Sequence, residues 1–133
     1  MTIKITLITP PDIFENDNRG ILLLNLPETS QTEATAWFAN FQSDEDINIY
    51  FYNGETEVPW ILHAMAVSQY KYIDIDETSG VSSWLAGYIL GKPNTYYTAK
   101  DLNVASIYSH INSNKVADVV EFLERTLGVD NKQ

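Results

Sequence analysis

The sequence predicts an α/β three-layer sandwich with a mainly parallel, Rossmann- or flavodoxin-like sheet. Strand-like runs alternate with helical patterns of about 10–15 residues between residues 20 and 127, and strands separated in this way pair in parallel through right-handed crossovers. The chain has 133 residues, 44% of them hydrophobic, which suits one core. We therefore expect a single domain over residues 1–133, with an extra strand at its N-terminal edge.

Turn signals delimit the expected strands. The first is an edge strand, because the Pro10-Pro11 pair that follows it is poorly suited to the centre of a sheet. The second is a continuous apolar run, typical of a strand buried on both faces. Asn53-Gly54 ends the third. The expected strands cover residues 3–9, 21–26, 47–52, 72–76 and 95–98.

Apolar residues at helical spacing mark the intervening helices. Thr29 or Ser30 can cap the first, Pro59 suits the first turn of the second, and Gly91-Lys92-Pro93 ends the third. Residues 102–110 form either a strand or a helix, and periodicity leaves both open. The expected helices cover residues 31–41, 59–69, 79–90 and 115–127.

The charge balance restricts the partners. The chain has 18 Asp and Glu against 8 Lys and Arg, a net charge of −10, and its basic residues are scattered. Such a chain is repelled by nucleic-acid phosphates, so no nucleic-acid partner is expected. The acidic residues either keep the protein soluble or form a surface that binds a basic partner. No apolar run approaches the roughly 20 residues of a membrane-spanning helix, and we expect a cytoplasmic protein without membrane contact.

The residue types available also limit the chemistry. The absence of Cys excludes disulfides and thiol catalysis. His63 and His110 form no metal-binding pair, and no glycine-rich phosphate loop occurs. We therefore expect no metal and no cofactor.

Ligands of open α/β sheets bind beyond the carboxyl ends of the strands. Asp76-Glu77-Thr78-Ser79-Gly80 pairs carboxylates with hydroxyls at a helix start, where backbone N–H groups could hold an anion. Ordinary helix capping by Thr78 or Ser79 explains the same pattern. The residues that this rule selects are Pro27, Glu28, Asn53, Gly54, Glu55, Asp74, Asp76, Glu77, Thr78, Ser79 and Gly80.

Several motifs follow one another between residues 72 and 123. An Asp-bearing strand, Ile73-Asp74-Ile75-Asp76, leads into the helix Ser79–Tyr88, then Gly91-Lys92-Pro93, the strand at 95–98 and Leu102-Asn103-Val104-Ala105. This order resembles the nucleoside 2-deoxyribosyltransferase family and its nucleotide-processing Rossmann-like relatives. In that family a Glu after the Trp of the helix attacks the sugar and forms a covalent intermediate.

The resemblance implies a site that lacks its nucleophile, because Leu85 occupies the position of that Glu. Asn103 matches a polar position that holds the nucleoside, and Thr78 or Ser79 takes the place of an Asp. Gly87 is expected to let its helix approach the sheet closely. The resemblance thus implies no catalytic residue; together with the strand-end rule it gives the ligand-binding set Pro27, Glu28, Asp76, Ser79, Gly80, Leu85 and Asn103.

Three functions remain open. The first is a nucleoside- or nucleotide-binding protein without transferase activity, in which Leu85 faces the crevice. The second is an enzyme that splits an N-glycosidic bond with carboxylates drawn from Glu28, Asp74, Asp76 and Glu77. The third is an acidic protein that docks a basic partner. A homo-oligomer is compatible with each, and Leu85 is plain core if the resemblance does not extend to the site.

Overall fold

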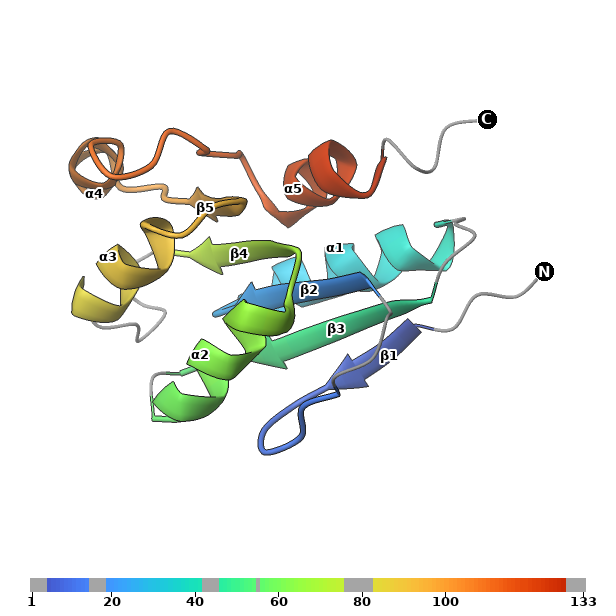
Figure 1. Cartoon of the computed structure of the whole chain (residues 1–133). Coiled ribbons are helices and arrows are strands. Elements are labelled where there is room, and N and C mark those ends of the chain that lie inside the picture. The colour runs from blue at the N-terminus through green and yellow to red at the C-terminus, as the bar shows by residue number, and fades with distance from the viewer. Residues whose placement is uncertain (1–4, 15–18, 42–45, 55, 76–82, 129–133) are drawn as a thin grey trace.

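The computed structural model describes residues 5–14, 19–41, 46–54, 56–75 and 83–128. Within them lies a five-stranded sheet, in the order β1-β3-β2-β4-β5, whose neighbouring strands are all parallel (Figure 1). The predicted fold class and the extra edge strand are confirmed. The strands are β1 Ile5–Ile8, β2 Arg19–Leu24, β3 Ile47–Tyr52, β4 Tyr70–Asp74 and β5 Thr95–Thr98.

Helices cover both faces of the sheet and complete the three layers. The helices are α1 Glu28–Ala39, α2 Val58–Val67, α3 Ser83–Leu90, α4 Leu102–Tyr108 and α5 Val119–Thr126. Alternate residues of β2 serve the two faces: Leu22 and Leu24 pack under α2 and α3, while Ile21 and Leu23 pack under α1 and α5. This alternation explains the continuous apolar run, because neither face of β2 meets water.

The strand order creates a switch point. From β2 the chain passes through α1 to β3 on one side, then through α2 to β4 on the other side of β2. The connections from β2 and β4 therefore leave the carboxyl edge in opposite directions, and it is at such a point that open α/β sheets bind their ligands. The chain after β1 is held over the α2 face, where Trp60 Nε1 donates to Asp12 O at 2.7 Å and Tyr50 Oη to Phe14 O at 2.6 Å.

The first helix begins earlier than predicted. Pro27 is the N-cap of α1, and its carbonyl oxygen accepts a hydrogen bond from Gln31 N at 3.0 Å. No side chain caps this helix, so the expected caps Thr29 and Ser30 are wrong. Both lie within the first turn, because Pro27 already has the fixed φ that suits a helix start.

The last helix begins later than predicted. Lys115 forms a parallel bridge with Tyr97 of β5, and Val116 N donates to Tyr97 O at 2.8 Å. The first residues of the amphipathic pattern are therefore extended, and α5 starts after its N-cap Asp118. Residues 102–108 are helical, which decides between the two predicted alternatives.

Two glycines differ in what surrounds them. A Cβ added at Gly20 would lie 2.7 Å from Val67 O, so this residue permits β2 to pass close to the backbone that ends α2. A Cβ added at Gly87 would meet nothing within 4 Å. The expectation that Gly87 allows a close approach of its helix to the sheet is wrong.

None of the helices in the described ranges has the length and apolar character needed to cross a bilayer.

Candidate functional site

Two asparagines join the loops that follow β2 and β3 at the carboxyl edge. The side-chain oxygen of Asn25 accepts a hydrogen bond from Gly54 N at 2.8 Å. The amide of Asn53 bonds to both backbone groups of Leu26, accepting from N at 2.9 Å and donating to O at 3.0 Å. These side-chain bonds replace the backbone ladder where the strands have ended, so the protein itself fixes the loops that follow β2 and β3.

Asn25 is the buried polar residue of this edge. It has a φ of 58°, in the left-handed region that Asn tolerates better than most residues, and its backbone N donates to Tyr52 O at 3.1 Å. Its side chain is 3% exposed. Among the described residues nothing accepts a hydrogen bond from its buried Nδ2. Leaving a buried donor unpaired costs about 1–3 kcal/mol, which makes this amide a candidate ligand contact.

Asp74 is the last residue of the neighbouring strand β4. The register pairs Leu24 of β2 with Ile73 of β4, and Asn25 and Asp74 each directly follow a member of this pair. Asp74 is 2% exposed, and its neighbour in β5 is the buried Thr98. The switch point thus combines a buried amide with a buried carboxylate.

The described charges of this edge are mainly negative. Glu28 begins α1, Glu57 is the N-cap of α2, and Asp101 precedes α4, whereas Lys100 follows β5. With Asp74 these residues give four carboxylates and one ammonium. Such a field repels anions, and the acidic residue in the first turn of α1 already occupies the favourable end of the helix dipole.

The structure separates the predicted site residues into three groups. Pro27 and Glu28 lie at the carboxyl end of β2 and are exposed. Asn103 is exposed in the first turn of α4, where its backbone N donates to Asp101 Oδ1 at 2.8 Å. Since β4 lies between β2 and β5, Glu28 and Asn103 follow strands that are not neighbours in the sheet. Asp76, Ser79 and Gly80 fall outside the described residues.

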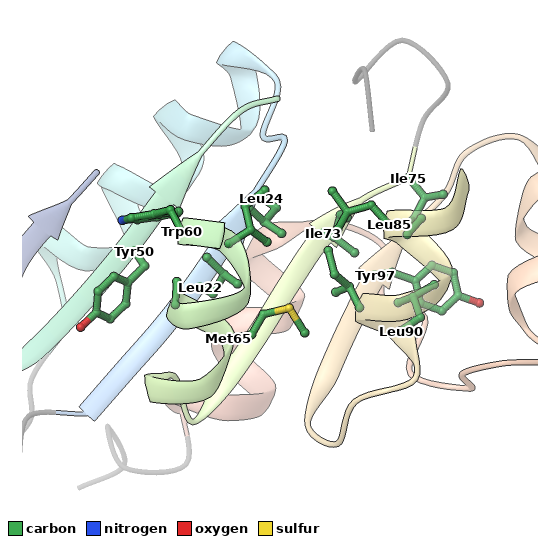
Figure 2. Packing of buried hydrophobic residues seen from close by; sticks show 14 of the residues in the cluster. Leu22, Leu24, Tyr50, Trp60, Met65, Ile73, Ile75, Leu85, Leu90 and Tyr97 are labelled. Carbon is green, nitrogen blue, oxygen red and sulfur yellow. The ribbon is translucent and has the colours of Figure 1, made fainter. Parts of the chain in front are cut away.

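Leu85 forms the third group and belongs to the core. Its side chain is completely buried in the apolar cluster between the sheet, α2 and α3. Figure 2 shows it together with Ile75, the residue that follows β4. No part of Leu85 is open to solvent, so the structure favours the interpretation of this residue as core rather than as a wall of an open crevice.

The predicted binding set omits the buried pair at the switch point. Asn25 is the one polar residue in the run Ile21-Leu22-Leu23-Leu24-Asn25-Leu26, and that exception was the available signal. An amide inside an apolar run has to find partners once the run is buried. The strand-end rule selected Asp74 and Asn53, and Asp74 was also a carboxylate of the enzyme alternative, but neither entered the predicted binding set.

A hollow on the α1 face of the sheet lacks buried polar groups of the kind found at the carboxyl edge. It has a volume of about 130 Å³ and lies between β1, β3, β2 and α1, against Leu7, Phe38 and Phe51. Its polar lining consists of Gln31 and Thr35, and no charged side chain lines it. It therefore offers apolar contact without the convergent polar groups that orient a small polar ligand.

The fold and this edge define an α/β three-layer sandwich with a polar switch point. No protein-family model matches the chain, and no curated protein matches it in sequence. The resemblance of residues 72–123 to nucleoside 2-deoxyribosyltransferases therefore stays a prediction.

Proposed function

We propose that this protein binds a nucleoside at the carboxyl edge of its sheet, between β2 and β4, without transferring the sugar. The observation that carries the proposal is the buried Nδ2 of Asn25, which has no partner among the described residues. Asp74, a buried carboxylate, ends the neighbouring strand β4. A donor and an acceptor at the carboxyl ends of the two strands that flank a topological switch point are polar groups that a ligand site there needs.

A nucleoside complements both groups. Nucleobases carry carbonyl oxygens and ring nitrogens that accept from an amide, and sugar hydroxyls donate to a carboxylate. Phosphate is less suitable, because it would add negative charge next to Glu28 and Asp74. Within the wider expectation of a nucleoside or nucleotide, the edge therefore supports the uncharged nucleoside.

The absence of transfer follows from Leu85. If the resemblance holds, this position carries the family's nucleophile, and the leucine found here is enclosed by apolar side chains. A leucine can neither attack the anomeric carbon nor accept a proton, so the covalent step has no donor of electrons at this position.

Thermal denaturation with nucleosides tests the proposal. A ligand that binds only the folded state stabilises it by about 2.7 kcal/mol at a concentration of 100 times Kd. We expect a nucleoside to raise the melting temperature and its 5′-monophosphate to raise it less. No shift with any common nucleoside at millimolar concentration would overturn the proposal.

A matched pair of variants assigns the site. Asn25→Asp keeps an oxygen that can accept from Gly54 N but replaces the Nδ2 donor, so it should abolish the nucleoside-induced shift. Asn40→Asp makes the same chemical change at the exposed C-cap of α1 and should preserve the shift. Loss of the shift in both variants would attribute it to net charge rather than to Asn25.

Hydrolysis of the N-glycosidic bond is the alternative, and Asp74 at the end of β4 is its candidate carboxyl. A positioned carboxyl can act as a general acid or base. We expect no release of base when deoxynucleosides are incubated with the protein. Release that disappears in Asp74→Asn would replace the binding proposal with a hydrolase.

A further inference from the structure

A pocket of about 260 Å³ lies at the opposite edge of the sheet, between α2 and α3 and beside the amino ends of β4 and β5. It has an apolar part, formed by Leu62, Met65, Ala66 and Pro93, and a polar part formed by Lys71, Lys92 and Tyr88. It shares no residue with the carboxyl edge, so what it binds is independent of the proposed nucleoside site.

Lys71 is a buried cation in this pocket. Its residue is 8% exposed, and its Nζ donates to Pro93 O at 3.3 Å, a long hydrogen bond. Among the described residues no carboxylate pairs with it, although the chain contains 18 Asp and Glu. Burial lowers the pKa of the Lys71 ammonium, because the loss of water disfavours its charged form. A buried ammonium without a counter-ion is unfavourable.

Lys92 supplies a second cation at the same pocket. Its Nζ lies 4.4 Å from the centre of the Tyr88 ring, a cation–π contact between two residues that line the pocket. Lys92 lies in the turn after α3, and Lys71 lies in β4, so two separate elements bring positive charge to one cavity. Two lysines at one pocket are a local excess of positive charge in a chain of net charge −10.

We propose that this pocket binds a small organic carboxylate with an apolar body. The carboxylate would accept hydrogen bonds from Lys71 and Lys92, and the apolar body would pack against Leu62 and Met65. The volume lies just below the usual range of about 300–1,000 Å³ for ligand pockets, which suits a short-chain acid.

Methionine methyl NMR tests this directly. The chain has two methionines, Met1 and Met65, and Met65 lines the pocket, so its methyl signal reports occupancy. Sodium hexanoate at millimolar concentration should shift the Met65 signal in a saturable manner. Hexanamide, which has the same apolar body without the charge, should bind at least about tenfold more weakly, the factor expected for loss of a charged hydrogen bond. Inorganic phosphate should leave the signal unchanged.

Two variants complete the test. Lys71→Met should weaken hexanoate binding by at least about tenfold, and Lys92→Gln, which changes a half-exposed residue, should weaken it in a chain whose core is intact. Lys115→Met, at an exposed lysine away from the pocket, should have no effect. An unshifted Met65 signal, equal affinity for hexanamide, or an equal response to phosphate would each overturn the proposal.

Discussion

Gly20 and Gly87 allow a matched test at the scale of single residues. In Gly20→Ala the new methyl would meet Val67 O at 2.7 Å, and overpacking of this kind typically costs about 1–3 kcal/mol. In Gly87→Ala the methyl meets nothing within 4 Å, and a helical Ala is more stable than Gly by roughly 0.5–1 kcal/mol. Urea denaturation of both variants should give changes of opposite sign. Destabilisation by Gly87→Ala would contradict the packing described for α3.

Leu85→Glu tests whether this residue is core. The side chain is completely buried among apolar residues, so an unpaired carboxylate there should lower the free energy of unfolding by more than about 3 kcal/mol. Leu85→Met, which nearly conserves volume, should cost less than about 1.5 kcal/mol. Chemical denaturation measures both. A well-folded Leu85→Glu protein with a small loss would show instead that the position faces a polar, open site.

Tyr97 carries a buried hydroxyl that the fold does not use. Its Oη has no hydrogen-bond partner among the described residues, and burial raises the pKa of the phenol above its ordinary value of 10.0. The folded protein therefore keeps this proton where the unfolded chain has lost it. The corresponding stability is complete below pH 10.0 and is lost as the pH rises through the folded-state pKa.

Tyr97→Phe should remove the loss of stability that the phenol causes at alkaline pH. At neutral pH the variant should be as stable as the parent or more stable by about 1 kcal/mol, because an unpaired polar group disappears from the core. Above pH 10.0 its advantage should grow. Denaturation curves across this pH range decide the matter, and a variant that is clearly less stable at neutral pH would show that the hydroxyl has a partner.

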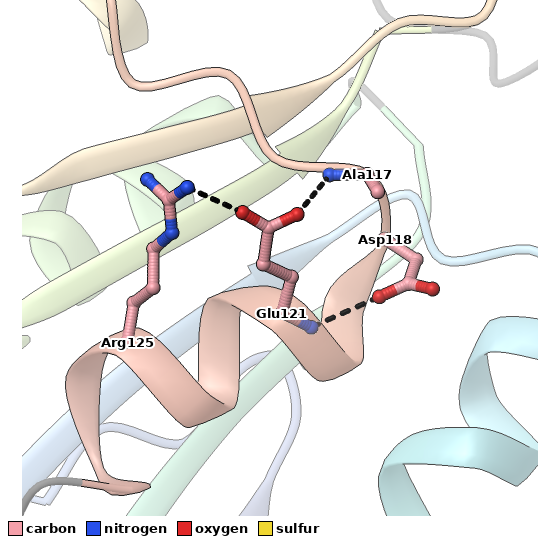
Figure 3. A network of polar contacts seen from close by, with 4 residues as sticks. All are labelled: Ala117, Asp118, Glu121 and Arg125. Atoms are coloured by element: carbon pink, nitrogen blue, oxygen red, sulfur yellow. Dashed lines mark hydrogen bonds and ion pairs between the residues drawn. The ribbon is translucent and has the colours of Figure 1, made fainter.

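At the scale of elements, the start of α5 is fixed by a reciprocal pair of hydrogen bonds. The Asp118 carboxylate accepts from Glu121 N at 2.9 Å, and the Glu121 carboxylate accepts from Ala117 N at 2.8 Å (Figure 3). The latter carboxylate also meets Arg125 at 2.6 Å. This arrangement satisfies backbone donors that the first turn of a helix leaves unpaired.

Asp118→Ala should therefore destabilise the protein by about 1 kcal/mol, whereas Asp118→Asn, which keeps an acceptor, should cost much less. Arg125→Ala should change stability by less than about 0.5 kcal/mol, because the ion pair is largely exposed. Thermal denaturation of the three variants checks this ranking. An Arg125→Ala loss larger than that of Asp118→Ala would contradict the dominant role of the cap.

The same helix shows what sequence patterns can and cannot predict. Its apolar face was evident, because Val119, Leu123 and Leu127 recur at helical spacing and are buried. Its start was not, because Val116 fits the same pattern while its backbone bonds to β5. That contact joins residues 19 positions apart in the chain, Tyr97 and Val116, and no local pattern contains it. The strands at 47–52 and 95–98 were predicted to the residue, since turn residues bound them.

The candidate site was predictable only in its location. The rule for parallel sheets places ligands at the carboxyl edge, and Glu28 lies there. That Asn25 and Asp74 follow neighbouring strands depends on strand order, because β2 and β4 become neighbours only when the chain crosses β2. The sequence alone does not reveal this strand order, so it gives no reason to place Asn25 and Asp74 in the same site.

At the scale of the whole molecule, the two edges of the sheet differ in charge. Glu28, Glu57, Asp74 and Asp101 lie toward the carboxyl edge together with Lys100, and the amino edge holds the pocket with Lys71 and Lys92. The two proposed ligands follow this difference, a hydroxyl-rich one at the acidic edge and an organic anion at the basic pocket. The net charge of −10 describes neither edge.

The most direct measurement of the nucleoside proposal is a titration followed by ¹⁵N–¹H correlation NMR. The proposal predicts saturable shifts for the backbone amides of Asn25, Leu26, Gly54 and Ile75, which surround the carboxyl ends of β2, β3 and β4, and little change at Lys71 and Lys92. A spectrum that does not respond to any nucleoside, or one that responds only around Lys71 at the amino edge, would contradict it.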